Sequence, residues 1–257
     1  PSGPRAVPGG SPFNVALALG RLRRPTAFLG CFGGDDHARC LKRALAQADV
    51  DLARAVSVDR PTPVVHVETD GAGQPAYRFA LADTAFETPL PWPGDGFTGA
   101  RHLHVGSSTA LNDRHGPGVA AALHAARGRL TTSFDPNIRP ALLPPRAETA
   151  RRVEERVALA DWVKASVEDL AWLYPREAPE AVAARWLRAA PRLVVVTRGA
   201  EGASAWSMQG PVTCRAPAVP VADTVGAGDT LMAALIDTLL DGGSAALDDA
   251  LVAHALE

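Results

Sequence analysis

The fold class is decided by residues 162–197, which read WVKASVEDLAWLYPREAPEAVAARWLRAAPRLVVVT. Two short apolar runs, at 162–165 and 193–197, have the length and β-branched content of buried strands. The helical pattern of residues 179–190 lies between them. A strand, a helix and a second strand at this spacing predict a parallel sheet that is covered on both faces.

The same alternation extends outward from this stretch in both directions. Further strands are expected at 26–32, 100–105 and 131–134, and further helices at 11–22, 38–48, 118–127, 147–160 and 226–240. Two hairpins interrupt the rhythm, one at 64–69 and 76–80 and the other at 203–207 and 212–216. The first hairpin turns at Asp70-Gly71-Ala72-Gly73, and we expect residues 60–86 to form a small β lid.

The bulk properties favour a single α/β domain without a nucleic-acid or membrane partner. The chain has 257 residues, of which 47% are hydrophobic, and a formal net charge of −2. Such a balance offers no basic surface for nucleic acid or anionic lipid. The apolar runs are too short to cross a bilayer. Three cysteines without paired spacing (Cys31, Cys40 and Cys214) are typical of a reducing cytoplasm, where we expect this protein.

Function is expected where the strands end, because an open parallel sheet binds ligands beyond the carboxyl ends of its strands. Nearly every predicted strand leads into a polar or glycine-rich segment. These segments are residues 30–36, 106–109, 135–139, 166–169, 197–202 and 223–229.

The segment that points to chemistry is residues 223–230, DTVGAGDT, which open the last long helical pattern. Gly226 and Gly228 allow a sharp turn, and the small side chains leave the amides of Ala227, Gly228 and Asp229 uncovered. Unpaired amides at a helix N-terminus bind anions and stabilise charge on a transferring phosphoryl group. A carboxylate beside such a site suits a base that takes the proton of an attacking hydroxyl. The alternative is that Asp229 is only a first-turn acid favoured by the helix dipole.

Two motifs give the chain a family resemblance. Residues 223–229 resemble the C-terminal signature of PfkB-type carbohydrate kinases, and residues 8–14, PGGSPFN, resemble their N-terminal GGxxxN signature. The resemblance covers essentially the whole chain, so it implies one kinase domain over residues 1–257. It also implies a ribokinase-like three-layer α/β/α sandwich with a mainly parallel sheet and a β lid. Residues 135–140, DPNIRP, are most similar to fructokinases.

The resemblance implies specific roles. ATP and Mg²⁺ are the implied cofactors, with K⁺ as an optional monovalent ion. Asp229 is implied as the catalytic base, with Gly226, Ala227 and Gly228 as the anion hole. The residues implied to contact the sugar are Gly9, Gly10, Asn14, Arg139 and Asp229. The residues implied to border ATP are Lys164, Ser166, Thr197, Gly199, Gly202, Thr224, Gly226 and Gly228.

Several of these residues have a structural alternative. Many relatives hold magnesium with an NxxE motif, where this chain has Ser166-Val167-Glu168-Asp169, so Asp169 is expected to act on the metal through water. Ser166 alternatively caps a helix with acids in its first turn. Residues 197–202 are alternatively a tight turn. Tyr77 and Arg78, on the lid hairpin, either touch the sugar or are ordinary exposed residues.

Relatives begin with an additional strand and continue with further helices, so we expect this chain to be cut at both ends. The lid hairpin is also suited to homodimer contacts.

The expected reaction is the phosphorylation of a sugar hydroxyl by ATP, with fructose as the sugar. A 2-keto-3-deoxygluconate kinase, or another sugar or nucleoside kinase, would keep the same motifs. A non-catalytic sugar- or nucleotide-binding protein of the same fold is the alternative from another class. A dinucleotide-dependent dehydrogenase is disfavoured because no GxGxxG follows an early strand.

Overall fold

The computed structural model describes residues 6–69, 75–92, 94, 97–218, 224–242 and 249–256. The strands are β1 (Cys31–Phe32), β2 (Val56–Ser57), β3 (Val64–Thr69), β4 (Pro75–Ala80), β5 (His102–Gly106), β6 (Thr131–Asp135), β7 (Trp162–Ser166), β8 (Leu193–Thr197), β9 (Ala203–Ser207) and β10 (Gly210–Cys214). The α-helices are α1 (Ser11–Arg21), α2 (Asp36–Gln47), α3 (Ser107–Leu111), α4 (Gly116–Ala126), α5 (Arg146–Val157), α6 (Val167–Leu173), α7 (Pro179–Ala189), α8 (Ala227–Asp241) and α9 (Asp249–Leu256). Short 3₁₀ turns are η1 (Ala85–Glu87), η2 (Pro140–Leu142) and η3 (Gly199–Glu201).

The central sheet has the strand order β10-β9-β8-β7-β6-β5. Strands β5 to β8 run parallel, whereas β9 and β10 return as an antiparallel hairpin. The predicted mainly parallel sheet and the second hairpin are therefore confirmed. Because parallel neighbours end at the same edge, β5 to β8 bring the polar segments that follow them together.

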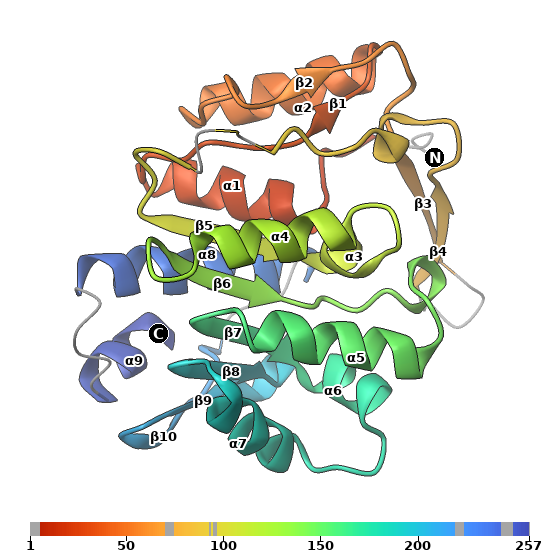
Figure 1. Ribbon diagram of the computed structural model, residues 1–257. Helices are drawn as coiled ribbons and strands as arrows, with labels where there is room; N and C mark the ends of the chain where they lie inside the picture. The colour runs from red at the N-terminus through yellow and green to blue at the C-terminus, as the bar shows by residue number, and fades with distance from the viewer. Residues whose placement is uncertain are drawn as a thin grey trace.

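Helices cover both faces of this sheet, as Figure 1 shows. On one face α4, α5, α6 and α7 pack over β5 to β8, and on the other face α8 packs on β7 to β9 with α1 beside it. Strand β8 shows why both faces are apolar. Leu193 and Val195 point to the α8 side, and Val194 and Val196 point to the α7 side.

Residues 26–32 form less strand than the sequence predicts. Only Cys31 and Phe32 are paired as β1, with β2, and Ala27 makes one isolated bridge to Asp51. The prediction of a strand over 26–32 is wrong in extent. The pairing with residues 51–57 is interrupted between the Ala27 bridge and Cys31, so a continuous ladder does not form.

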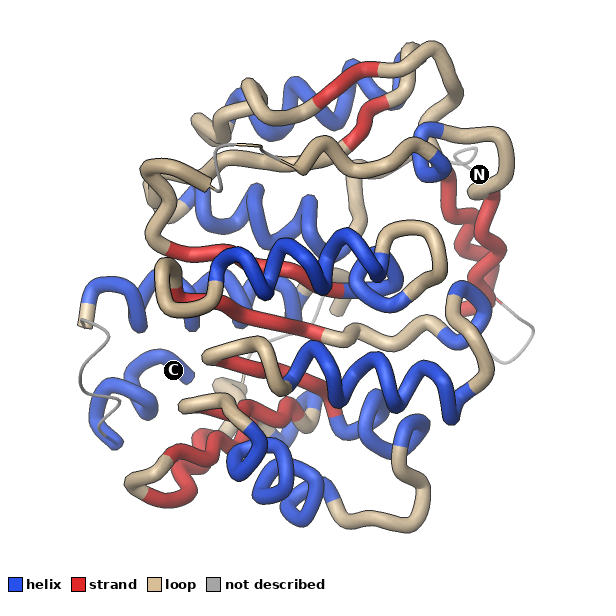
Figure 2. The backbone as a smooth tube through the Cα atoms, in the orientation of Figure 1, coloured by secondary structure: helices blue, strands red, loops and turns tan. Residues whose placement is uncertain are grey.

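The lid hairpin is confirmed as β3 paired antiparallel with β4. It stands apart from the central sheet at one side of Figures 1 and 2. Val65, Val67 and Tyr77 are exposed on it. Its predicted turn, Asp70 to Gly73, lies outside the described residues. Within the described part of the chain, no helix is long and apolar enough to cross a membrane.

Candidate active site

The N-termini of helices α1 and α8 both line one large cavity. Helix α1 starts after Gly10, whose φ is +116°, and α8 starts after Gly226, whose left-handed φ is +81°. No side chain caps either helix start. Such ends leave peptide N–H groups available to a ligand, and both dipoles favour an anion there. The glycines are needed because a side chain is strained at these positive φ values.

At the start of α8, one of the three amides predicted to form an anion hole is already hydrogen-bonded. The N–H of Ala227 donates to the carbonyl of Thr224 at 3.2 Å, so the prediction that Ala227 contributes a free amide is wrong. This hydrogen bond closes the turn that contains Gly226. The N–H groups of Gly228 and Asp229 donate to no described residue.

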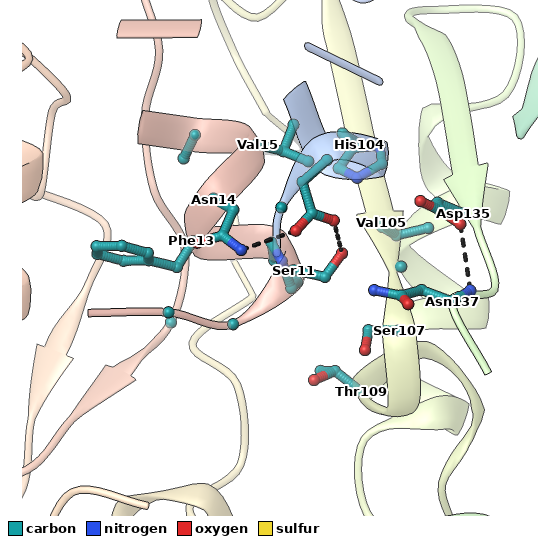
Figure 3. A pocket seen from close by; sticks show the side chains of 18 of the residues that line it. Ser11, Phe13, Asn14, Val15, His104, Val105, Ser107, Thr109, Asp135 and Asn137 are labelled. Atoms are coloured by element: carbon teal, nitrogen blue, oxygen red, sulfur yellow. Dashed lines mark hydrogen bonds between the residues drawn. The ribbon is translucent and has the colours of Figure 1, made fainter. Parts of the chain in front are cut away.

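Asp229 is held in place from the start of α1. Its Oδ1 accepts a 2.7 Å hydrogen bond from the Ser11 hydroxyl, and its Oδ2 accepts one of 2.7 Å from Asn14 Nδ2. The dashed lines in Figure 3 mark both bonds. Asp229 is 7% exposed, and it lines the cavity with Gly9, Gly10 and Asn14. A fixed carboxylate with further lone pairs towards a cavity is suited to accept a proton from a bound hydroxyl.

A buried ion pair lies below the start of α8. Lys164 Nζ is 2.9 Å from Asp135 Oδ2, and the two side chains are 5% and 1% exposed. A Cβ at Gly228 would lie 3.2 Å from Lys164 Nζ, so the ammonium group is directly behind this turn. Burial raises the pKa of Asp135 to about 6, although Lys164 opposes that shift. Burial works to lower the pKa of Lys164, but Asp135, Asp169 and Asp229 outweigh it and the pKa is raised. Lys164 is therefore a cation that is paired with Asp135 and lines the cavity.

Asp169 and Ser166 form a capping box at the start of α6. Ser166 Oγ accepts the N–H of Asp169 at 3.1 Å, while Asp169 accepts the N–H groups of Ser166 at 3.0 Å and Ile138 at 2.7 Å. The capping alternative for Ser166 is thus confirmed. Both residues also line the cavity. Among the described residues there is no group of three His, Cys, Asp or Glu side chains set to hold a metal. A hydrated Mg²⁺ bound mainly by phosphate fits this acid better than a caged one, since magnesium keeps several waters.

The residues predicted to border ATP do not all line the cavity. Thr197, Gly199, Thr224 and Gly226 line the cavity. Gly202 does not line it, and its contact with ATP stays a prediction. A Cβ at Gly202 would lie 2.0 Å from the carbonyl of Cys214, and its φ is +101°. The glycine is required there because the β9–β10 hairpin backbone crosses at close range. Asp223 lies outside the described residues.

The opposite wall of the cavity contains residues that the sequence indicates only as a loop. Figure 3 shows Ser107, Thr109 and Asn137 facing Asn14 across the site. Ser107 has φ +60° and Asn137 has φ +37°, an uncommon conformation for residues other than glycine. Strain of this kind at the ends of β5 and β6 is typical of functional sites. Arg139 also lines the cavity, and its Nη1 donates to the carbonyl of Ile138 at 2.8 Å.

His104 lies at the back of the site, where Figure 3 shows it near Asp135. Its Nδ1 is 2.9 Å from the Ser133 hydroxyl, and its buried Nε2 has no hydrogen-bond partner among the described residues. Burial lowers its pKa to about 3, and Lys164 contributes in the same direction. The ring is therefore neutral at physiological pH. The contact with Ser133 fits a structural role for this histidine.

The geometry agrees with what comparison of the sequence shows. Residues 2–251 match the pfkB family carbohydrate kinase. The chain belongs to this family. A fructokinase from Rhizobium leguminosarum bv. trifolii is 36% identical to this kinase over 90% of this chain and 71% of its own length. A 2-dehydro-3-deoxygluconokinase from Bacillus subtilis (strain 168) is 29% identical over 91% of this chain and 74% of its own length.

Solved structures resemble this kinase along nearly its whole length. Fructokinase from Xylella fastidiosa with bound ATP has a TM-score of 0.88 and 25% identity, covering 97% of this chain and 81% of its own. Fructokinase from Vibrio cholerae O395, bound to fructose, ADP and calcium ion, has a TM-score of 0.83 and 29% identity, covering 98% and 82%. The predicted ribokinase-like fold and sugar-kinase class are confirmed.

Ser11 is a candidate site residue of this kinase that the sequence interpretation missed. It lies inside the PGGSPFN motif, but a serine at a helix start is ordinarily explained as a cap. In the structure the residue is 8% exposed, and its hydroxyl donates to Asp229. The sequence feature that could have indicated Ser11 is its position one residue after Gly10, at the same helix start as Asn14.

Proposed function

We propose that this kinase transfers the γ-phosphoryl group of ATP to a hydroxyl of a ketohexose, with fructose as the acceptor. The observation that supports it most is the position of the Asp229 carboxylate. It lies between two uncapped helix starts and is fixed from α1 by Ser11 and Asn14.

Asp229 accepts the proton in this reaction. The acceptor hydroxyl donates to a carboxylate lone pair that Ser11 and Asn14 leave open. As the hydroxyl oxygen forms its bond to phosphorus, the proton passes to Asp229 and the bond from phosphorus to the leaving ADP oxygen breaks. Holding the carboxylate rigidly by two hydrogen bonds keeps it within reach of the hydroxyl, which lowers the entropic cost of the step.

Two kinds of group stabilise the negative charge on the transferring phosphoryl group. The N–H groups of Gly228 and Asp229, which donate to no described residue, lie at the α8 start, and Lys164 adds a positive charge behind the same turn. These donors are fixed before the reaction, which is the condition for strong transition-state stabilisation. Asp169 is the acid that would hold a hydrated Mg²⁺, which supplies further charge compensation on the phosphates when bound.

A second acceptor, 2-keto-3-deoxygluconate, is favoured by one observation, the similarity to a 2-dehydro-3-deoxygluconokinase over 91% of this chain. Fructose is the first choice because the fructokinase relative is more similar, at 36% against 29% identity.

A substrate panel tests the proposal. The purified chain is given ATP, Mg²⁺ and one acceptor at a time, and ADP release is followed by a coupled assay. We expect kcat/KM for fructose to exceed that for 2-keto-3-deoxygluconate and for a nucleoside by about tenfold or more. A reversed order would move the assignment to the second acceptor. ATP binding without ADP release for every acceptor would contradict phosphoryl transfer and support a non-catalytic role.

The lid hairpin is proposed to serve in a homodimer. Val65, Val67 and Tyr77 expose apolar area on β3 and β4, and all three also line the cavity. A pairing of two hairpins would cover this surface beside the sugar site.

A further inference from the structure

A second cavity lies at the amino edge of the central sheet. It has a volume of about 440 Å³, within the range of roughly 300–1,000 Å³ that small-molecule pockets occupy. Its lining includes residues 100–101, 128–131, 161–162 and 192, which precede or begin β5, β6, β7 and β8. Figure 1 shows these strand starts on the side away from the lid hairpin. Each strand has five residues, so the cavity lies roughly 17 Å from the carboxyl ends at which the active site is built.

Three arginine side chains from separate parts of the chain line this cavity. They are Arg101 before β5, Arg129 between α4 and β6, and Arg192 before β8. Arg101 also lines the active-site cavity, and its Nη2 donates to the carbonyl of Leu240 at 3.0 Å, which uses one of the five N–H donors of a guanidinium group. The guanidinium groups of Arg129 and Arg192 make no hydrogen bond or ion pair with any residue that the structure describes.

The main chain around these arginines is fixed. The N–H of Arg192 donates to the carbonyl of Asp161 at 2.7 Å, and the N–H of Arg129 donates to that of Ala126 at 3.0 Å. Asp161 is the acid among the lining residues. Its Oδ2 accepts the N–H and the hydroxyl of Thr132, at 2.8 and 3.0 Å, so this carboxylate is held to the start of β6. The cavity therefore has an excess of positive charge on an anchored frame.

Trp162 adds a donor without an acceptor to the same cavity. The side chain is 3% exposed, and its Nε1 has no hydrogen-bond partner among the described residues. Its ring stacks on that of His102, with centroids 4.9 Å apart and 20° between the planes. A buried indole N–H ordinarily has an acceptor, and one that lacks it calls for an explanation such as a ligand. Since guanidinium and indole groups only donate, an anion with several acceptor oxygens suits this set.

We infer that this cavity binds a small phosphate ester, whose phosphate group lies between Arg129 and Arg192. A planar guanidinium group binds two phosphate oxygens at once, and Trp162 Nε1 is the donor that gains an acceptor. A bare phosphate fills only part of 440 Å³, so the remaining volume holds an alcohol part about the size of a sugar. This inference does not depend on which acceptor the kinase phosphorylates, because the cavity lies at the opposite end of the strands from Asp229.

Calorimetric titration of the whole chain tests the site. Glucose 6-phosphate should bind at least about tenfold more tightly than glucose or inorganic phosphate, each titrated separately. Arg129→Gln and Arg192→Gln should each weaken its binding by about tenfold, the usual effect of losing a charge-assisted hydrogen bond. Arg188→Gln is the matched control, because Arg188 is an exposed arginine of α7 that does not line the cavity, and it should leave the affinity unchanged.

Three results would overturn the proposal. They are an absence of glucose 6-phosphate binding, an equal affinity for inorganic phosphate, and equal affinities in the variants at positions 129, 188 and 192. The second of these would show a general anion site without a place for the ester.

The indole N–H resonance of Trp162 shows where the ligand binds. Trp162→Phe identifies this resonance among those of the five tryptophans. It should shift when glucose 6-phosphate is added to the parent chain, to Arg188→Gln and to Lys164→Met, which removes the active-site cation. It should stay in place in the double variant Arg129→Gln/Arg192→Gln. A resonance that does not shift in the parent chain, or binding that is lost in Lys164→Met, would place the ligand in the active site and overturn the proposal.

Discussion

The hydroxyl of Ser11 donates a 2.7 Å hydrogen bond to Oδ1 of Asp229, although the two residues are 218 positions apart in the chain. This bond joins the start of α1 to the start of α8. It orients the carboxylate on which the proposed proton transfer depends, and Asn14 holds the second oxygen from the same helix.

Removing this hydroxyl should reduce activity without unfolding the protein. Ser11→Ala deletes one hydrogen bond to a charged acceptor, and such bonds are worth about 1.5–3 kcal/mol. We expect kcat/KM to fall by about tenfold or more. The matched control is Ser57→Ala, which removes an exposed hydroxyl that accepts only from Lys42. Equal kinetics for Ser11→Ala and Ser57→Ala would show that the bond does not position the base.

Gly228 should be required because Lys164 is packed behind it. A Cβ there would lie 3.2 Å from Nζ, which is closer than an ordinary contact, so the ammonium group must move. We expect Gly228→Ala to lower turnover by about tenfold. In a Lys164→Met background the same change should have little further effect, since the two changes act through one group. Turnover that falls by the same factor in both backgrounds would contradict this coupling.

Asp135 should make stability depend on pH in a direction opposite to most acids. Its pKa is raised by burial from 3.8 to about 6 in the folded chain. The folded state therefore binds more protons than the unfolded state within this interval, and the free energy of unfolding falls as pH rises. Asp135→Asn cannot titrate. The free energy of unfolding of the parent chain minus that of Asp135→Asn should decrease between about pH 4 and pH 6 in urea titrations. A flat or rising difference would contradict the assignment.

Asp35 should make the free energy of unfolding depend on pH in the direction that is usual for acids. Its carboxylate accepts the N–H of Ala38 at 2.9 Å and both the N–H and hydroxyl of Thr62, at 2.8 and 2.6 Å, which ties α2 to the start of the lid. Burial works to raise its pKa, but these hydrogen bonds outweigh it and lower the pKa to about 2. Its contribution is complete above pH 3.8 and is lost as pH falls towards 2.

The same carboxylate gives a stability prediction at neutral pH. Asp35→Ala should lower the free energy of unfolding by about 1–2 kcal/mol, the usual value for a lost helix N-cap. Asp36→Ala is the control, because Asp36 is 87% exposed and pairs only with Arg39. Urea unfolding of both variants checks this. If the two variants lose the same free energy of unfolding, Asp35 does not act as a stabilising helix cap.

The sequence predicts the elements that depend on local pattern. Helix α8 can be read from Gly226 and the apolar spacing after Asp229, and β8 from its consecutive valines. The five-residue α3 is not predicted, because it is too short for a periodic signal and begins at Ser107 in an unusual conformation. Residues 26–32 have a strand-like composition, but composition does not reveal that, in the described structure, only residues 27, 31 and 32 are paired.

The site is predicted less completely than the fold for a related reason. Asp229, Asn14 and Gly226 lie within motifs that can be recognised locally. The pairing of Lys164 with Asp135 and the bond from Ser11 to Asp229 join residues from different elements, and only the folded chain brings them together. At Gly202 the folded chain adds a second reason for a glycine, a close backbone crossing, which the sequence does not distinguish from a ligand contact.

The most direct test of the account is turnover by Asp229→Asn, measured as ADP release with fructose and ATP, beside calorimetric binding of ATP to the same variant. Replacing the carboxylate removes the proton acceptor but leaves the free main-chain N–H groups of positions 228 and 229 in place. We predict that kcat falls by about a thousandfold while the Kd for ATP changes by less than about threefold. Turnover within about tenfold of the parent chain would contradict Asp229 as the base.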